Sequence, residues 1–273
     1  MSTDLPAADP PSGLELRGVT VRHGSVPALS RVSATFPGGQ ISCVLGENGS
    51  GKSTLVSLLS GLVRHDDGEL LVGGSAMRFR SPRQARAAGI ATVWEDLAVA
   101  PLLSVWRNFF LGAEPTRGRW PARRLDLDTA REVTARAMAR VGVTALDPDQ
   151  PASRLQAGER QSLAVARALH FGARALVIDE PTTAVTVARQ TMFGQAILAA
   201  RAQGLAVVVV TNNPRYAHLI GDRFLLLANG QVAGNLTRED VDADMLTALM
   251  AGGDQLSVLT ETLTALHPEL GER

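Results

Sequence analysis

The sequence predicts an α/β fold in which a mostly parallel β-sheet is covered on both faces. Apolar runs of four to six residues alternate with segments of helical character, as buried parallel strands do; the runs lie at 41–45, 175–178, 205–210 and 224–227. The first run leads into a glycine-rich turn, and leucines spaced along one helix face follow at Leu55, Leu58, Leu59 and Leu62. Strand, turn and helix in this order begin a βαβ unit.

Further elements surround this unit. Alternating apolar residues over 14–21 predict a strand. Residues 101–172 are poor in strand signals and rich in Ala, Arg and Leu, so they predict a mainly helical insertion, with exposed loops at 120–124 and 147–151. From residue 241 onward, apolar residues at helical spacing predict amphipathic helices that pack on the body rather than a separate binding module.

The composition excludes several classes of protein. Acidic and basic side chains balance at 27 each, so no net field favours a nucleic-acid partner. Residues 1–13 are rich in Pro, Ala and Asp, which predicts a disordered lead-in rather than a secretory signal. No apolar stretch approaches the roughly 20 residues of a membrane-spanning helix, so a membrane role requires a partner. Cys43, the single cysteine, is expected to be a small buried side chain.

A phosphate-binding motif lies between the strand at 41–45 and the helix. The residues are Gly46, Glu47, Asn48, Gly49, Ser50, Gly51, Lys52 and Ser53, followed by Thr54. Glycines in this pattern allow backbone N–H groups to surround phosphate oxygens, while Lys52 contacts the β- and γ-phosphates and the Ser53 hydroxyl reaches Mg²⁺. The positive end of the helix dipole adds to the attraction. The motif, with a strand before it and a helix after it, predicts binding of Mg-ATP.

A pair of carboxylates provides the second part of the predicted site. Asp179 and Glu180 directly follow the apolar run 175–178. A carboxylate at the end of a buried strand beside the strand of the loop can hold Mg²⁺ through water, the role expected of Asp179. Glu180 would face the γ-phosphate and polarise the attacking water. The pair is a weak signal alone and a strong one together with the loop.

Residues 14–240 resemble the ATP-binding cassette family. The loop reads GENGSGKST as in that family, 178–182 match its acidic strand end, and 155–161 (LQAGERQ) look like its signature. The stretches 89–96 and 101–112 are similar to importers of the ribose/xylose/fructose type. The resemblance implies a P-loop NTPase fold, with a mostly parallel sheet, added antiparallel strands and a helical subdomain. The implied division is 14–95 and 173–240 for a RecA-like ATP-binding core, 96–172 for the helical subdomain and 241–273 for a helical tail.

The resemblance also implies cofactors and partners. Two cassettes face each other head to tail, so that Mg-ATP lies between the phosphate loop of one chain and the signature of the other, here Gln156, Gly158 and Glu159. Closure and opening drive a transmembrane permease, contacted by about 95–112, which works with a solute-binding protein. The cassette would be cytoplasmic and peripheral on the inner face of the cell membrane. Whether it pairs with itself or with a related chain stays open.

Several positions depart from the family pattern. The γ-phosphate-sensing glutamine is Glu95, which can ligate the metal but donates no hydrogen bond. The signature serine is Gln156 and the first signature glycine is Ala157. Thr186 replaces an aspartate, a milder change. The switch histidine corresponds to Asn212, a candidate catalytic residue that cannot carry positive charge. Losing one preorganised donor costs about 10²–10³ in rate, so we expect tight ATP binding with slow hydrolysis.

Two functional readings follow, and both give the same fold. The first is the energising ATPase subunit of a carbohydrate importer, which the intact Glu180 favours. The second is a nucleotide-binding regulatory partner that no longer hydrolyses, which Glu95, Gln156 and Asn212 favour. A non-transport cassette protein is disfavoured by the single cassette and the neutral charge.

The histidines add one further candidate. His23 falls where the family places an aromatic that stacks on adenine, and both adenine contact and an ordinary surface histidine remain open. The other four histidines show no metal-ligand spacing; they are His65, His170, His218 and His267.

Overall fold

The computed structural model describes residues 13–94, 99–118, 122–181 and 187–251 of the 273. The strands are β1 (Gly13–His23), β2 (Val26–Pro37), β3 (Ile41–Leu45), β4 (Asp67–Val72), β5 (Ser75–Met77), β6 (Ile90–Val93), β7 (Thr116–Arg117), β8 (Arg124–Leu125), β9 (Ala175–Asp179), β10 (Ala206–Val210), β11 (Arg223–Ala228) and β12 (Gln231–Thr237). The helices are α1 (Lys52–Leu59), α2 (Pro82–Ala87), α3 (Val105–Phe110), α4 (Leu127–Arg140), α5 (Ala157–His170), α6 (Val187–Ala202), α7 (Pro214–Ile220) and α8 (Ala243–Ala251), with a 3-10 turn η1 (Ala152–Arg154).

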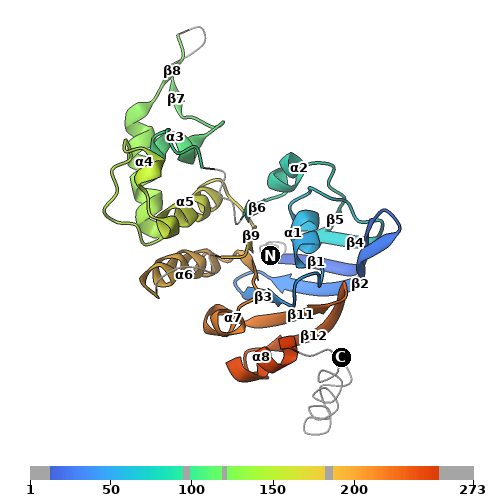
Figure 1. The fold of residues 1–273 in the computed structure, drawn as a ribbon. Helices are drawn as coiled ribbons and strands as arrows, with labels where there is room; N and C mark the ends of the chain where they lie inside the picture. The colour runs from blue at the N-terminus through green and yellow to red at the C-terminus, as the bar shows by residue number, and fades with distance from the viewer. Residues whose placement is uncertain (1–12, 95–98, 119–121, 182–186, 252–273) are drawn as a thin grey trace, which may run out of the picture.

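A six-stranded sheet forms the centre of the molecule, in the order β12-β11-β3-β10-β9-β6. All its pairings are parallel except that of β11 with β12. A second, antiparallel sheet has the order β2-β1-β4-β5. The predicted mostly parallel sheet with added antiparallel strands is therefore confirmed (Figure 1).

The strand order corrects one expectation. The strand ending at Asp179 was expected to lie directly beside the strand that precedes the phosphate loop. In the structure β10 lies between them, since it pairs with β3 on one side and with β9 on the other. Both strands still end at the same edge of the sheet, because all three run parallel.

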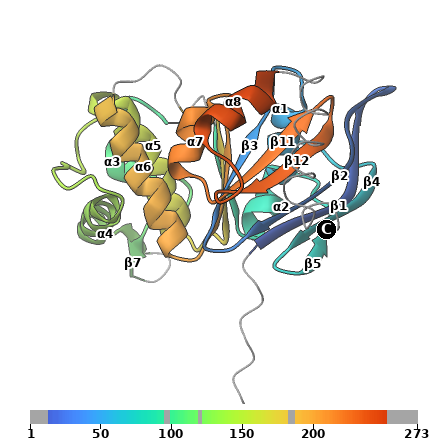
Figure 2. The ribbon, with the colours of Figure 1, turned by 90° about the horizontal axis from the view of Figure 1, so that it is seen from below.

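The central sheet is buried on both faces, which explains its uninterrupted apolar strands. Along β3, Ile41, Cys43 and Leu45 belong to the apolar cluster that includes α5, α6 and α7, whereas Val44 belongs to the cluster that includes α1 and the antiparallel sheet. Figure 2 shows these layers on either side of β3. Cys43 is fully buried as predicted, and burial raises the pKa of its thiol.

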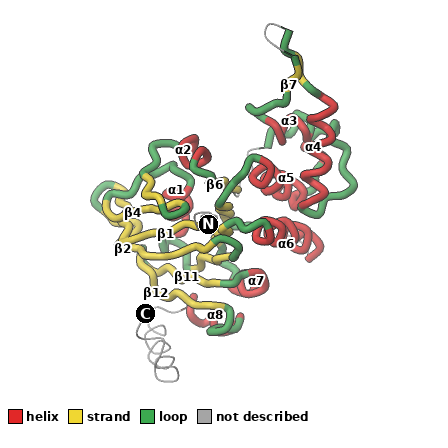
Figure 3. The backbone as a smooth tube through the Cα atoms, turned by 180° about the vertical axis from the view of Figure 1, so that it is seen from behind, coloured by secondary structure: helices red, strands yellow, loops and turns green. Residues whose placement is uncertain are grey.

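The helices α3, α4 and α5, with the β7–β8 hairpin, project to one side of the sheets (Figure 3). Their interior is apolar, with Phe109, Met138 and Leu163 almost fully buried. The segment is mainly helical as expected, although the two short strands β7 and β8 were not predicted. Part of the predicted loop 120–124 lies outside the described residues.

Two element boundaries differ from the prediction. Gly13 belongs to β1 rather than to the lead-in. The first helix was expected to reach Leu62, but α1 ends at Leu59, the backbone turns at Gly61 with φ of 76°, and Leu62 is 57% exposed. The tail begins with a helix as predicted, α8, and the rest of it lies outside the described residues. None of the helices in the described ranges has the length and apolar character needed to cross a membrane.

Candidate nucleotide site

The loop between β3 and α1 has a backbone that only glycine can adopt at its first position. Gly46 has φ of 153°, and a Cβ there would lie 2.3 Å from the carbonyl oxygen of Leu227 and 2.6 Å from Ser50 Oγ. The loop is also tied to the β11–β12 turn, because Gly230 N–H donates to the Ser50 carbonyl at 3.0 Å. The loop is therefore held in shape by contacts with a distant strand.

Lys52 folds back across this loop. Lys52 is the only lysine among the 27 Lys and Arg residues of the sequence, and it is 7% exposed. Its Nζ donates to the carbonyl oxygens of Gly46 at 2.7 Å and Glu47 at 2.9 Å. Burial lowers the pKa of Lys52, while the carboxylates of Glu180 and Asp179 act in the opposite direction. The predicted acidic pair is thus close enough to interact electrostatically with the loop lysine.

The polar groups of the loop fit an anionic ligand. Ser50 Oγ is buried, and no hydrogen-bond partner for it occurs in the described part of the chain. A buried hydroxyl without a partner is uncommon, and an anion in the loop would supply an acceptor. The loop opens onto the N-terminus of α1, where backbone N–H groups favour negative charge. The donors present therefore suit a polyphosphate.

The first turn of α1 approaches the end of β1. Ser53 is exposed, and Thr54 Oγ1 lies 3.4 Å from Nε2 of His23. The structure therefore brings His23, which is distant in sequence, next to the predicted phosphate site. Whether it contacts adenine stays a prediction.

Asp179 and Glu180 stand at the same sheet edge as the loop. Asp179 is the last residue of β9 and pairs with Val210 in register, and Glu180 N–H donates to the Val210 carbonyl at 2.9 Å. Glu180 has φ of 41°, which is unusual for a residue with a Cβ. Such conformations cost about 1–3 kcal/mol and cluster at functional sites.

Asn212 follows the strand that lies between β3 and β9. The preceding residue, Thr211, donates its N–H to the Val44 carbonyl at 3.1 Å, and the next one, Asn213, caps α7 by accepting from Tyr216 N–H at 3.0 Å. Asn212 itself is exposed. The carboxyl ends of β3, β10 and β9 thus bring the loop, Asn212 and the acidic pair to one edge, where ligands of α/β sheets bind.

The predicted signature residues lie elsewhere. Gln156 is the N-cap of α5, and its N–H donates to the Glu159 carboxylate at 2.7 Å, while Gly158 is buried in the first turn. In Figures 1 and 2, α5 lies on the helical side of the sheet and α1 on the other side. The chain does not bring its own signature to its own loop.

Some predicted residues fall outside the described part of the chain. Glu95 and Thr186 do so, and their roles stay predictions. Within the described residues, no group of three or more His, Cys, Asp or Glu side chains could hold a metal ion.

Two parts of the structure were not predicted from the sequence. One is Gly230, whose contact with Ser50 spans 180 positions and leaves no local signal. The other is a cavity of about 510 Å³ that lies between α2 and β6 on one side and α5 and the end of α3 on the other. Its lining includes Arg83, Arg86 and Arg167. No Asp or Glu lines it in the part of the chain that the structure describes.

Comparison with known proteins identifies the family. Residues 29–183 match the ABC transporter family. The chain is 36% identical over 248 residues to the fructose import ATP-binding protein FrcA of Rhizobium meliloti, covering 89% of this chain and 95% of that protein. It is 37% identical over 237 residues to a ribose import ATP-binding protein of Rubrobacter xylanophilus, covering 87% of this chain and 45% of that protein. The chain thus spans about half the length of such ribose import relatives.

Solved structures agree on the fold. A nucleotide-free ATP-binding cassette from an ABC transporter superposes with a TM-score of 0.74 at 20% identity, covering 86% of this chain and 95% of that one. The ADP conformation of another such cassette gives a TM-score of 0.73 at 19% identity, covering 90% of this chain and 98% of that one. Both confirm the predicted fold. The chain belongs to the ABC transporter family and has the fold of its ATP-binding cassettes.

Proposed function

We propose that this chain is the ATP-binding subunit of an ABC transporter that imports a carbohydrate, and that it hydrolyses Mg-ATP to drive transport. The observation that carries the proposal is the loop, with Lys52 held across it by two backbone carbonyls and with Glu180 and Asp179 within electrostatic reach. The family match and the names of the fructose and ribose import relatives support the carbohydrate.

Each residue of the loop edge has a role in this proposal. The loop amides and Lys52 bind the phosphates, Ser53 and Asp179 hold magnesium, and Glu180 orients and polarises the attacking water. Magnesium, when bound, neutralises charge on the phosphate oxygens. A single carboxylate is sufficient on the protein side, because Mg²⁺ commonly takes one or two carboxylates together with phosphates and waters.

Hydrolysis is expected to be slow. Asn212 lies at the site edge where a cationic side chain would stabilise developing negative charge, and an amide provides less of this stabilisation. Steady-state ATPase activity near that of ordinary importer cassettes would contradict this expectation.

A complete site requires two chains. The loop and the signature lie on different sides of the sheet, so the signature residues Gln156, Gly158 and Glu159 would complete a site on a second cassette. This second cassette is either another copy or a related chain. The separation of α1 from α5 supports the head-to-tail pair.

The membrane partner would contact the arginine-lined cavity. Arg167 donates to the Leu111 carbonyl at 3.5 Å, and its pKa is lowered by burial and by the neighbouring Arg86. Leu111 and Phe171, which also line the cavity, are about half exposed. Two cations close together beside exposed apolar side chains suit a partner segment with both acidic and apolar residues. In the proposal this partner is a permease served by a solute-binding protein, and the cassette lies at the cytoplasmic face of the membrane.

One pair of measurements tests the proposal. Calorimetry with Mg-ATP on the isolated chain should show binding, and phosphate release should be detectable with the permease present and fall in Glu180→Gln. Binding without hydrolysis in either condition would favour the second candidate, a nucleotide-binding regulatory subunit, which the replacements Gln156 and Asn212 support. Absence of binding would refute both.

A further inference from the structure

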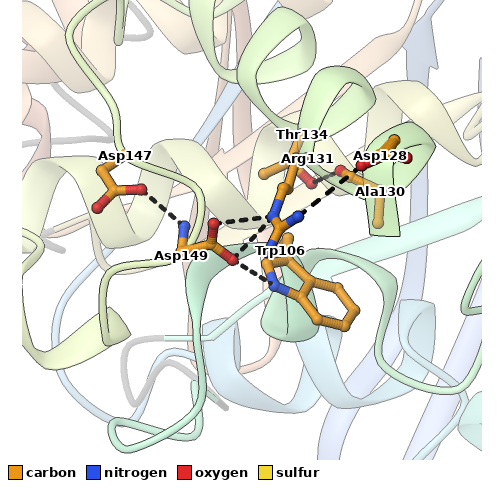
Figure 4. Close-up of polar contacts among 7 residues, drawn as sticks. All are labelled: Trp106, Asp128, Ala130, Arg131, Thr134, Asp147 and Asp149. Atoms are coloured by element: carbon orange, nitrogen blue, oxygen red, sulfur yellow. Dashed lines mark hydrogen bonds and ion pairs between the residues drawn. The ribbon is translucent and has the colours of Figure 1, made fainter. Parts of the chain in front are cut away.

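A polar cluster in the helical part connects three segments that are distant in sequence. Asp149 lies in the loop between α4 and η1, and Figure 4 shows its carboxylate facing both the Trp106 indole nitrogen and the Arg131 guanidinium. Trp106 Nε1 donates to Asp149 Oδ1 at 3.2 Å, and Arg131 Nε lies 2.8 Å from Oδ2. Asp149 N–H donates to Asp147 Oδ1 at 3.0 Å, which fixes the turn that presents the carboxylate.

Backbone hydrogen bonds join the same segments. Four of them connect 101–106, at the start of α3, to 148–153: Val105 N–H to Gln150 O at 3.0 Å, Trp106 N–H to Pro148 O at 3.1 Å, Ala152 N–H to Leu103 O at 2.9 Å and Ser153 N–H to Pro101 O at 2.9 Å. An isolated β-bridge joins Ser104 to Pro151. The two segments therefore form one short antiparallel connection.

This connection ends at the signature. Its second segment runs into η1 (Ala152–Arg154), which is followed by the almost fully buried Leu155 and then by Gln156, the N-cap of α5. Arg160 donates from its guanidinium to the Leu155 carbonyl, which anchors the helix to the incoming chain. The position of Gln156 is thus fixed from the side of α3 as well as by α5 itself.

We propose that Asp149 is a positioning residue, which holds the Gln156 end of α5 in a fixed place relative to α3 through Trp106 and Arg131. The inference rests on the proposed function, in which this end of α5 meets a nucleotide on a second cassette. Asp149 suits the role because it accepts from α3 and α4 at once while standing seven residues before Gln156. Trp106 is 5% exposed, so its indole N–H needs an acceptor within the protein.

The first test measures position directly in the isolated chain. Cys43 is fully buried, so a spin label attaches selectively to the cysteine of Gln156→Cys, or to that of His170→Cys at the other end of α5. Asp149→Ala should increase the mobile fraction of the label at 156 severalfold and leave the label at 170 unchanged. The matched control is Glu132→Gln, which removes the exposed Arg136–Glu132 pair on the same helix α4 without touching the connection.

The second test measures function. In the assembled transporter, Asp149→Ala should lower turnover about ten- to a hundredfold, because a small misplacement of a contacting group is enough to do so. Mg-ATP binding by the isolated chain should be unchanged. The turnover of Asp149→Asn should lie between those of the parent chain and Asp149→Ala, since asparagine retains an acceptor for Trp106 and loses the charge that faces Arg131. If Asp149→Ala does not fold, Trp106→Phe removes the same indole bond and decides the question.

Several results would overturn the inference. In Asp149→Ala, the mobile fraction of the label at 156 could stay unchanged, or it could rise equally at 156 and 170. Glu132→Gln could also raise the mobile fraction at 156 as much as Asp149→Ala does. A parent chain that fails to bind Mg-ATP would instead refute the proposed function. The label experiment in the isolated chain keeps the two failures apart.

Discussion

Replacing Gly46 by alanine tests the geometry of the loop most directly. At this position an alanine meets two separate obstacles. The backbone φ of 153° is unfavourable for a residue with a Cβ, and the new methyl would lie 2.3 Å from the Leu227 carbonyl oxygen. A backbone oxygen within a buried strand cannot move aside as the end of a flexible side chain can. Strain contributes about 1–3 kcal/mol and overpacking a further 1–3 kcal/mol, approximately.

Gly49 in the same loop is the matched control. It also has a positive φ, 84°, but nothing lies within 4 Å of a Cβ built there. Gly49→Ala should therefore cost only the strain, about 1–3 kcal/mol. The difference between the two variants isolates the steric contact with Leu227, and we expect Gly46→Ala to lose about 1–3 kcal/mol more.

Urea-induced unfolding followed by circular dichroism, without nucleotide, gives both free energies of unfolding. The slopes against urea concentration should agree between the variants, because they report the surface exposed on unfolding. Equal losses for Gly46→Ala and Gly49→Ala would refute the reasoning, since they would mean that the loop does not approach β11 as described.

Three further outcomes are expected. The Lys52 amine should react with an acylating reagent at lower pH than an ordinary lysine, because burial lowers its pKa. Mg-ATP should move the reaction to higher pH, since phosphate favours the ammonium form. Mass spectrometry of the Lys52 peptide measures both pH profiles, and a profile that does not change with nucleotide would contradict the site. Asn212→His should raise ATP hydrolysis about tenfold or more by restoring a cationic donor, read as phosphate release in the assembled transporter; no gain would remove Asn212 from the explanation of slow turnover. Arg86→Glu should weaken co-sedimentation with permease-containing membranes about tenfold or more. The control Arg64→Glu changes an exposed residue outside the cavity and should leave co-sedimentation unchanged. Equal losses in the two variants would mean that the net charge of the chain, and not the cavity, determines binding.

The predictable part of the site is local in sequence. The residues from Gly46 to Ser53 follow a buried strand and begin a helix, and both constraints act over a few positions: glycine for the backbone, apolar side chains for the strand. The acidic pair at Asp179 and Glu180 was found for the same reason, as the polar end of an apolar run. Family resemblance then supplied the signature at Gln156, which has no local signal of its own chemistry.

One boundary was predicted wrongly, and two features were not predicted at all. The helix was extended to Leu62 because its spacing continues the apolar face, but the backbone turns at Gly61 and leaves Leu62 exposed. The β7–β8 hairpin has only two residues in each strand, too few to produce an alternating pattern. The hydrogen bond between Asp149 and Trp106 spans 43 positions, and the local sequence around either residue does not predict it.

The sequence by itself determined that a phosphate loop stands between a strand and a helix in an α/β cassette, because apolar periodicity and glycine placement are read over a few adjacent residues. Only the tertiary structure decided that β10 lies between β3 and β9, that Gly230 closes the loop, and that three arginines line one cavity. Parallel strands are joined by crossovers that skip positions in the sheet, so their order depends on packing among all the layers. Contacts between these layers join residues that are distant in the chain, and the local sequence around each residue does not predict the contact.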